Sequence, residues 1–283
     1  MGSAFGFLAV LFFLVGHTQV KILDHFPVHQ VVFIRALGVL FFSLPYLYFK
    51  KISFFGVNKK DLILRGLFGS IALFLYFTTL QVLPLSHAVL LQQFAPLFAL
   101  FISHFLLKES SSPLVYVLFF MSFLGVYLVK DSSVGWSFYY LYGLTAAAFA
   151  ALAYNFVRRL RQTDHPMVVL SYFQYCLLPV SFIGVAFFEH KQPVVSDLQP
   201  ILLLGVFSFL AQLCLTLAYQ KSLVSKASSF NFLAIPLSTG VGYVFFKETI
   251  SYQQGVGMVM VLTCVLVNLF VINRSQAPSE SKA

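Results

Sequence analysis

Two long apolar segments of this chain match each other at a distance of 139 residues. Residues 85–109 read LSHAVLLQQFAPLFALFISHFLLKE, and residues 224–248 read VSKASSFNFLAIPLSTGVGYVFFKE. Each segment has a proline near its centre, Pro96 in the first and Pro236 in the second. Hydrophobic segments that are interrupted at corresponding places in two halves of a chain indicate the binding site of a transporter.

The composition requires lipid as the main solvent. The chain has 283 residues, of which 59% are apolar and 10% are charged, whereas soluble proteins carry about 25% charged residues. A run of about twenty apolar residues spans a bilayer, and ten such runs predict ten transmembrane helices. We expect them at 3–20, 28–49, 61–80, 84–107, 113–130, 136–157, 166–188, 198–220, 225–246 and 251–272.

The repeat divides these helices into two sets of five. The chain therefore predicts an all-α integral membrane protein with a first repeat at 1–135, a second repeat at 136–273 and a disordered polar tail at 274–283. Because five is odd, the second repeat must cross the membrane in the inverted sense. Inverted repeats are typical of carriers that alternate access around a central site.

Basic residues predict the orientation of the chain. Of the 18 Lys and Arg residues, thirteen fall on one side of the predicted helices, with Arg65 among them, and four fall on the other. Arg35 is the remaining one and is the single charge expected well inside a helix. The side with more Lys and Arg faces the cytoplasm, so we expect both termini there and place the protein in the inner membrane.

The two prolines and their neighbouring amides are the first candidate site residues. A proline inside a helix frees the carbonyl four residues earlier, so Pro96 and Pro236 could shape a cavity or could introduce kinks that improve packing. Gln92 falls on Asn231 in the repeat. These amides could bind a substrate, or they could join helices by hydrogen bonds.

Three further residues are candidates for contact with a substrate. Arg35 lies eight residues after Pro27, and it could attract a carboxylate or fix helix packing. The repeat places Gln174 at the equivalent position, so the fold does not require a charge there. Tyr76 and Tyr219 offer a ring and a hydroxyl near the predicted cavity.

Other polar residues favour less specific roles. His17, His87 and His104 lie close to predicted helix ends, where interfacial hydrogen bonding is more common than proton relay. The pairs Lys108–Glu109 and Lys247–Glu248 could form gates, but adjacent residues on a helix point in different directions, which favours anchoring at the interface. The three cysteines lie in apolar runs without metal-ligand spacing. We expect no metal and no cofactor.

The blocks LPLSHAVLLQQFAPLFALFISHFLLKE and AIPLSTGVGYVFFKE, together with Arg35, resemble the EamA family of the drug/metabolite transporter superfamily. The resemblance covers nearly the whole chain, although lysine replaces the usual glycine before glutamate in both blocks. It implies ten helices in two inverted halves, with a central cavity lined mostly by the first, third, fourth, sixth, eighth and ninth helices. It also implies a small organic substrate, and the order of the blocks is similar to that of S-adenosylmethionine carriers.

These observations predict a secondary transporter for a small polar or zwitterionic metabolite, which could be amino-acid-like or S-adenosylmethionine-like. The expected partners are the substrate and the lipid bilayer, without nucleic acid, and the expected state is a monomer or a homodimer. One alternative is a membrane-embedded enzyme that acts on lipid-borne substrates, but the sequence has no GxSxG or HExxH motif. The other alternative is a membrane subunit that transports nothing.

Overall fold

The computed structural model describes residues 2–95, 98, 113–129, 138–221 and 233–275. These residues form ten α-helices and no strand. The helices are α1 (Gly2–Ile22), α2 (Val28–Phe49), α3 (Lys59–Val82), α4 (Leu85–Gln92), α6 (Pro113–Val129), α7 (Phe138–Arg159), α8 (Pro166–Phe187), α9 (Leu198–Lys221), α11 (Ala234–Phe246) and α12 (Tyr252–Ser275).

Six spans among the described residues are long and apolar enough to cross a membrane, judged by length and composition. They are Ala4–Ile22, Val28–Phe49, Lys59–Val82, Phe138–Gln162, Pro166–Phe187 and Val195–Gln220. Large apolar side chains such as Phe41 and Phe245 are exposed on the outside of the bundle, where a soluble protein would carry charge. The prediction of an all-α integral membrane protein is confirmed.

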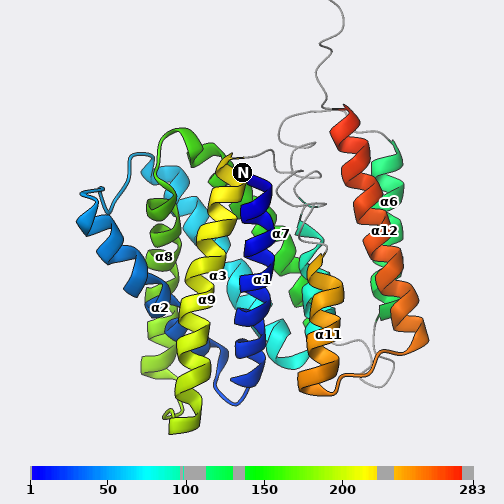
Figure 1. The fold of residues 1–283 in the computed structure, drawn as a ribbon, viewed down its shortest axis with the longest axis horizontal. Helices are drawn as coiled ribbons and strands as arrows, with labels where there is room; N and C mark the ends of the chain where they lie inside the picture. Colours follow the sequence, from blue (N-terminus) through cyan, green and yellow to red (C-terminus); the bar gives the residue numbers. More distant parts are fainter. Residues whose placement is uncertain (1, 96–97, 99–112, 130–137, 222–232, 276–283) are drawn as a thin grey trace, which may run out of the picture.

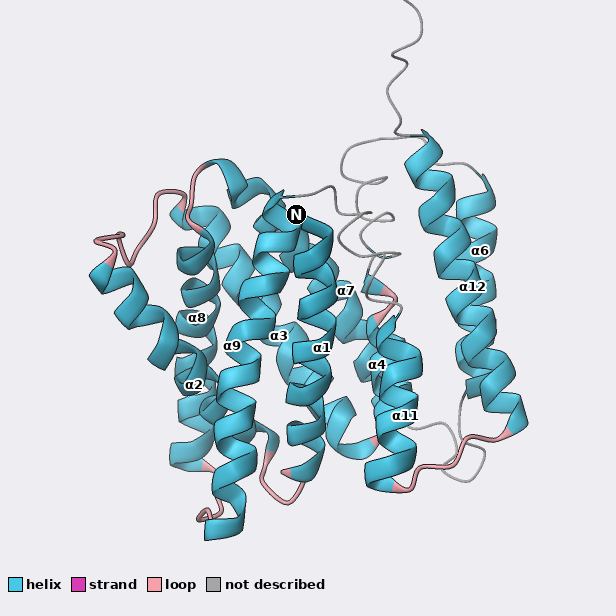
Figure 2. Cartoon of the chain, viewed as in Figure 1, coloured by secondary structure: helices cyan, strands magenta, loops and turns pink. Residues whose placement is uncertain are grey.

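The helix pairs follow the repeat. Replacing each helix by its equivalent in the other half gives the same set of pairs. Helix α1 packs against α9 and α3 packs against α7, while α2 pairs with α8, α4 with α11, and α6 with α12. Figure 1 shows the pair α6 and α12 at one edge of the bundle, and Figure 2 shows α4 beside α11. The start of α1 and the end of α12 lie at the same end of the bundle (Figure 1). The prediction of two inverted five-helix repeats is therefore confirmed.

Small residues allow the central helices to approach closely. A Cβ added to Gly38 of α2 would lie 2.5 Å from the Cα atom of Gly205 in α9, so the two backbones touch at this crossing. Ala146 and Ala150 are buried along α7, which packs on α3. Close contact through small residues is the usual way in which membrane helices associate.

The two repeat segments differ from simple long helices in their described parts. Helix α4 ends at Gln92, although the apolar run continues to residue 107. Helix α11 begins at Ala234, so Pro236 is its third residue rather than its centre. Pro96 lies outside the described residues.

Candidate functional site

A cavity of about 120 Å³ lies between the two repeats. Residues of α1, α2, α3, α4, α7, α8, α9 and α11 line it, and six of these eight helices are those that the family resemblance implied. Apolar side chains make most of the wall. The polar side chains that line it are His17, Arg35, Arg65, Tyr76, Gln92, Gln93, Tyr154 and Gln212.

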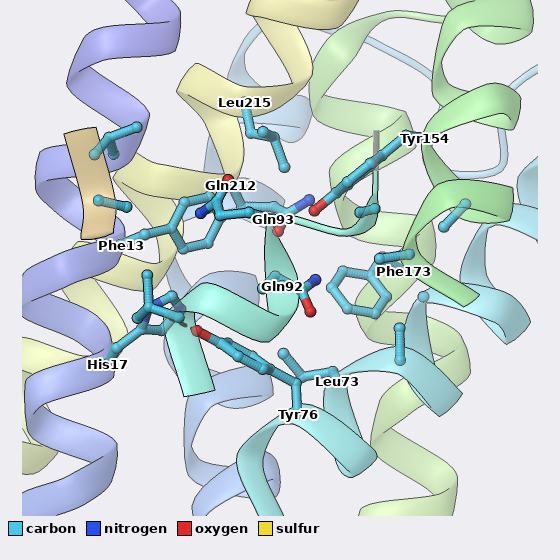
Figure 3. A pocket seen from close by; sticks show the side chains of 18 of the residues that line it. Phe13, His17, Leu73, Tyr76, Gln92, Gln93, Tyr154, Phe173, Gln212 and Leu215 are labelled. Carbon is cyan, nitrogen blue, oxygen red and sulfur yellow. Dashed lines mark hydrogen bonds between the residues drawn. The ribbon is translucent and has the colours of Figure 1, made fainter. Parts of the chain in front are cut away.

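The end of α4 places two neighbouring amides in this pocket. After Gln92 the helix changes to tighter turns, in which the N–H groups of Gln93 and Phe94 donate to the carbonyls of Leu90 and Leu91, three residues back. Gln92 and Gln93 both line the pocket, and Figure 3 shows them between Tyr76 and Tyr154. The buried Oε1 atom of Gln92 accepts no hydrogen bond from any described residue, so it is available to a ligand.

Arg35 lies in α2 and is 2% exposed. Its guanidinium donates to the Oε1 atoms of Gln174 and Gln212, each at 3.5 Å. It also lies 5.5 Å from the ring centre of Phe173. Since Gln174 occupies the equivalent position in the second repeat, equivalent residues of the two repeats meet at the pocket.

Arg65 is a pocket residue that the sequence analysis missed. We had expected it among the cytoplasmic charges, and Arg35 as the single charge inside a helix. Both expectations are wrong, because Arg65 lies in the seventh position of α3, is 2% exposed and lines the cavity. Its guanidinium lies 4.5 Å from the ring centre of Phe173, and its Nε atom has no partner among the described residues. Gly69, one turn later, leaves room for it, since an added Cβ would clash with Nη1 of Arg65.

A signal for Arg65 was present in its neighbours. The residue lies between the apolar stretches LIL and LFG, beyond the polar start of the helix. Six residues after Lys59, a rise of 1.5 Å per residue places it about 9 Å into the helix. A depth argument, of the kind applied to Arg35, would have separated Arg65 from the loop lysines.

The predicted tyrosines have different positions. Tyr76 lines the pocket, and its hydroxyl lies 3.3 Å from Nδ1 of His17 (Figure 3). His17 also lines the pocket, so the expectation of a helix-end role is wrong. Tyr219 does not line the pocket; it stacks on Tyr154 at 4.9 Å between ring centres, and Tyr154 takes the place in the wall.

The remaining predicted residues have the following places. Gln92, like Arg35 and Tyr76, lines the cavity. Pro236 is exposed on α11 and does not line it, whereas Ala234 does. Two predicted residues lie outside the described part of the chain: Pro96 and Asn231.

The charges in the pocket are unbalanced. Arg35 and Arg65 line it, and no Asp or Glu is found among the lining residues that the structure describes. Neither arginine forms an ion pair within the described chain. The described residues also contain no cluster of three or more His, Cys, Asp or Glu side chains that could hold a metal ion. The pocket can therefore bind a polar or negatively charged group through its N–H and O–H donors.

An ion pair joins three helices at one end of the bundle, beside α4. Glu248 lies 2.9 Å from Nζ of Lys21 at the end of α1, and both of its carboxylate oxygens accept from the N–H group of Leu85, at 3.0 Å. Lys21 also donates to the carbonyl of Leu83 at 2.8 Å. Glu248 thus joins α1 and the start of α4 to the end of α11, which is more than interfacial anchoring. The pair Lys108–Glu109 lies outside the described residues.

Comparison with known proteins identifies the family. The EamA-like transporter family matches the chain twice, over residues 1–130 and 137–270. The chain belongs to this family. It is a family of transporters rather than of enzymes.

Individual relatives agree with this assignment. The chain is 27% identical over 251 residues to a pseudopaline exporter of Pseudomonas aeruginosa, with 86% of each chain covered. It is 26% identical over 267 residues to an uncharacterized transporter of Helicobacter pylori, with 90% of each covered. A solved crystal structure matches the fold with a TM-score of 0.70 at 18% identity, and covers 98% of this chain and 99% of its own.

Proposed function

We propose that this EamA-type transporter moves a small polar or zwitterionic organic metabolite across the inner membrane by alternating access. The observation that carries the proposal is the pocket with eight polar lining residues, which lies between two inverted repeats. Sites of alternating-access carriers lie at such repeat interfaces near the middle of the bilayer. The excess of Lys and Arg at one end supports cytoplasmic termini.

Three of the pocket residues are proposed to contact the substrate. Gln92 offers an acceptor that is otherwise unpaired, Tyr76 offers a hydroxyl, and Arg35 offers a positive charge. Asn231 is proposed as the counterpart of Gln92 from the second repeat, and Pro96 and Pro236 as residues that shape the broken segments. We also propose that the first repeat ends near residue 135 and that the second begins there.

The ion pair of Glu248 supports the conformational part of the mechanism. It ties α1, α4 and α11 together at the end of the bundle opposite the start of α1. With cytoplasmic termini, this end faces away from the cytoplasm. The pair therefore stabilises a state closed to the outside, and it must break when the pocket opens there.

The related pseudopaline exporter supports a metabolite as the substrate class. An amino-acid-like compound fits the mixture of arginine and amide side chains in the pocket. An S-adenosylmethionine-like compound is the competing substrate, because the sequence resembles that branch. A non-transporting membrane subunit is the competing function.

Transport by the purified protein in proteoliposomes tests the proposal. Vesicles loaded with a defined mixture of amino acids, organic acids and S-adenosylmethionine are diluted, and efflux is followed by mass spectrometry. Gln92→Leu should reduce efflux about five- to tenfold, since a hydrogen bond to a polar ligand is worth about 1–1.5 kcal/mol. Gln253→Leu, the same change at an exposed position of α12, should have no effect. Unchanged efflux in Gln92→Leu would remove Gln92 from the site, and a protein that transports nothing would support the subunit alternative.

A further inference from the structure

We propose that the pocket selects a net-anionic organic acid, whose carboxylate is held by Arg35 and Arg65, over neutral zwitterions and cations. This inference rests on the proposed transport function and specifies its substrate class.

Two buried guanidiniums without a counter-ion carry the inference. Arg35 and Arg65 are each 2% exposed and line one cavity. Their neighbours in the described chain are rings and amides; no carboxylate pairs with either. Removing an ion from water costs several kcal/mol, and an unpaired buried charge is strongly destabilising. A bound anion would offset this cost for both arginines.

Some donors of these arginines are unpaired or only weakly paired among the described residues. A guanidinium carries five N–H donors. Those of Arg35 reach two amide oxygens at the long distance of 3.5 Å, and Nε of Arg65 donates to no described atom. Paired N–H donors of arginine match the two oxygens of a carboxylate.

Phe173 lies beside both arginines. Its ring centre lies 5.5 Å from the guanidinium carbon of Arg35 and 4.5 Å from that of Arg65. The two positive charges repel each other, and the low-dielectric surroundings strengthen this repulsion. A shared anion between them converts that repulsion into attraction.

The repeat shows that the fold itself does not need these charges. The equivalents of Arg35 and Arg65 in the second repeat are Gln174 and Leu204, and both are fully buried. A neutral amide and an apolar side chain therefore occupy the two equivalent buried positions in the second repeat. The charges are specific to the pocket wall of the first repeat.

The rest of the pocket limits the ligand further. The unpaired Oε1 atom of Gln92 can accept from an N–H or O–H donor on the substrate, as in a hydroxy acid or an acidic amino acid. The mostly apolar wall accepts a carbon skeleton. A buried water occupies roughly 10–15 Å³ of such space, so the cavity of about 120 Å³ has room for about ten non-hydrogen atoms. This volume fits a small acid such as glutamate or malate; glycerol 3-phosphate is of similar size, so the test includes it as the competing anion.

The test compares charge classes in one efflux assay. Proteoliposomes contain equal concentrations of L-glutamate, L-malate, L-alanine, L-serine, L-lysine, S-adenosylmethionine and glycerol 3-phosphate, and efflux is measured by mass spectrometry. We expect glutamate or malate to leave at least about tenfold faster than the neutral, cationic and phosphorylated compounds. We expect Arg65→Gln to abolish this preference and Arg65→Lys to retain part of it, since lysine keeps the charge without the planar fork.

Controls separate this inference from the proposed function. Arg158→Gln removes a charge from an exposed position at the end of α7 and should leave the preference unchanged. Because Arg65→Gln could fail to fold, thermal shifts of wild type with glutamate and with alanine provide a second measurement, and the acid should stabilise more. Faster efflux of alanine, serine, lysine or S-adenosylmethionine overturns the anion inference while transport stands, and faster efflux of glycerol 3-phosphate overturns the choice of a carboxylate. No protein-dependent efflux of any compound overturns both.

Discussion

Arg35 of the first repeat and Gln174 of the second occupy equivalent positions, and their side chains meet in the folded chain. Around them the helices pair in the same way in both halves. The chemistry is different, because both arginines of the pocket come from the first repeat, whereas the second repeat contributes Tyr154, Phe173 and Gln212. The comparison shows that a duplicated architecture can keep its helix contacts while one half provides both arginines of the pocket.

An exchange of the equivalent residues is the strongest way to break this comparison. Arg35→Gln should reduce efflux of acidic substrates about a hundredfold, since charge-assisted hydrogen bonds contribute about 1.5–3 kcal/mol. Adding Gln174→Arg returns a guanidinium to the same contact from the opposite repeat, and about a tenfold recovery is expected. Efflux rates of the two variants and of wild type in proteoliposomes measure this.

The matched control for the exchange is Gln174→Arg in the wild-type background. It places a third guanidinium beside Arg35, and like-charge repulsion should lower the melting temperature without improving efflux. Equal efflux in wild type and Arg35→Gln would contradict a role of this charge in the substrate site.

The crossing of α2 and α9 offers a second test, which concerns the symmetric architecture rather than the charge. Gly38→Leu should prevent the two backbones from touching, because a Cβ there already meets the Cα atom of Gly205 at 2.5 Å. Overpacking of this kind costs typically 1–3 kcal/mol or more. We expect a clear loss of monodisperse protein and a lower melting temperature in detergent.

Gly240 provides the comparison for that substitution. An added Cβ at this exposed position of α11 meets no atom within 4 Å, so Gly240→Leu should leave melting temperature and yield nearly unchanged. Equal behaviour of the two leucine variants would show that the close approach of α2 and α9 is not needed for the fold.

The smallest expected effect is on stability and concerns the ion pair between Lys21 and Glu248. Glu248→Gln removes the ion pair with Lys21 but keeps a hydrogen-bond acceptor for the N–H group of Leu85. Since both partners are more than 10% exposed, solvent screens the pair, and a loss of about 1 kcal/mol is expected. Thermal unfolding in detergent measures it, and Lys21→Gln should lose a similar amount. A larger loss in only one of the two variants would show that the pair does not act as a unit.

Much of the fold could be predicted from the sequence, because the length of an apolar run in lipid determines a helix. The bounds predicted for α2 agree with the structure, and those of the other long helices differ by a few residues. The end of α4 at Gln92 was not predictable from hydropathy, since the apolar run continues beyond it. Its position depends on local turns that bring two amides to the cavity.

The pocket was predicted less completely, because a one-dimensional pattern does not determine which side chains meet. Tyr219 was chosen for its position along α9, but in the structure its ring stacks on that of Tyr154, which lines the pocket instead. Arg65 was assigned to the loop charges because of the nearby lysines, although its depth in α3 places it in the wall. Gln92 was chosen from the repeat, Arg35 from its depth and Tyr76 for a ring and a hydroxyl near the predicted cavity. These three line the cavity; their contact with a substrate stays a prediction.

An experimental structure of the transporter with the acid that leaves the proteoliposomes fastest is the most direct test of the charged site. The account predicts a carboxylate between Arg35 and Arg65, with oxygens within about 3 Å of nitrogen atoms of both guanidiniums, and a donor of the ligand on Oε1 of Gln92. A ligand bound in the same cavity with its carboxylate directed away from both arginines, or bound outside the cavity, would contradict it.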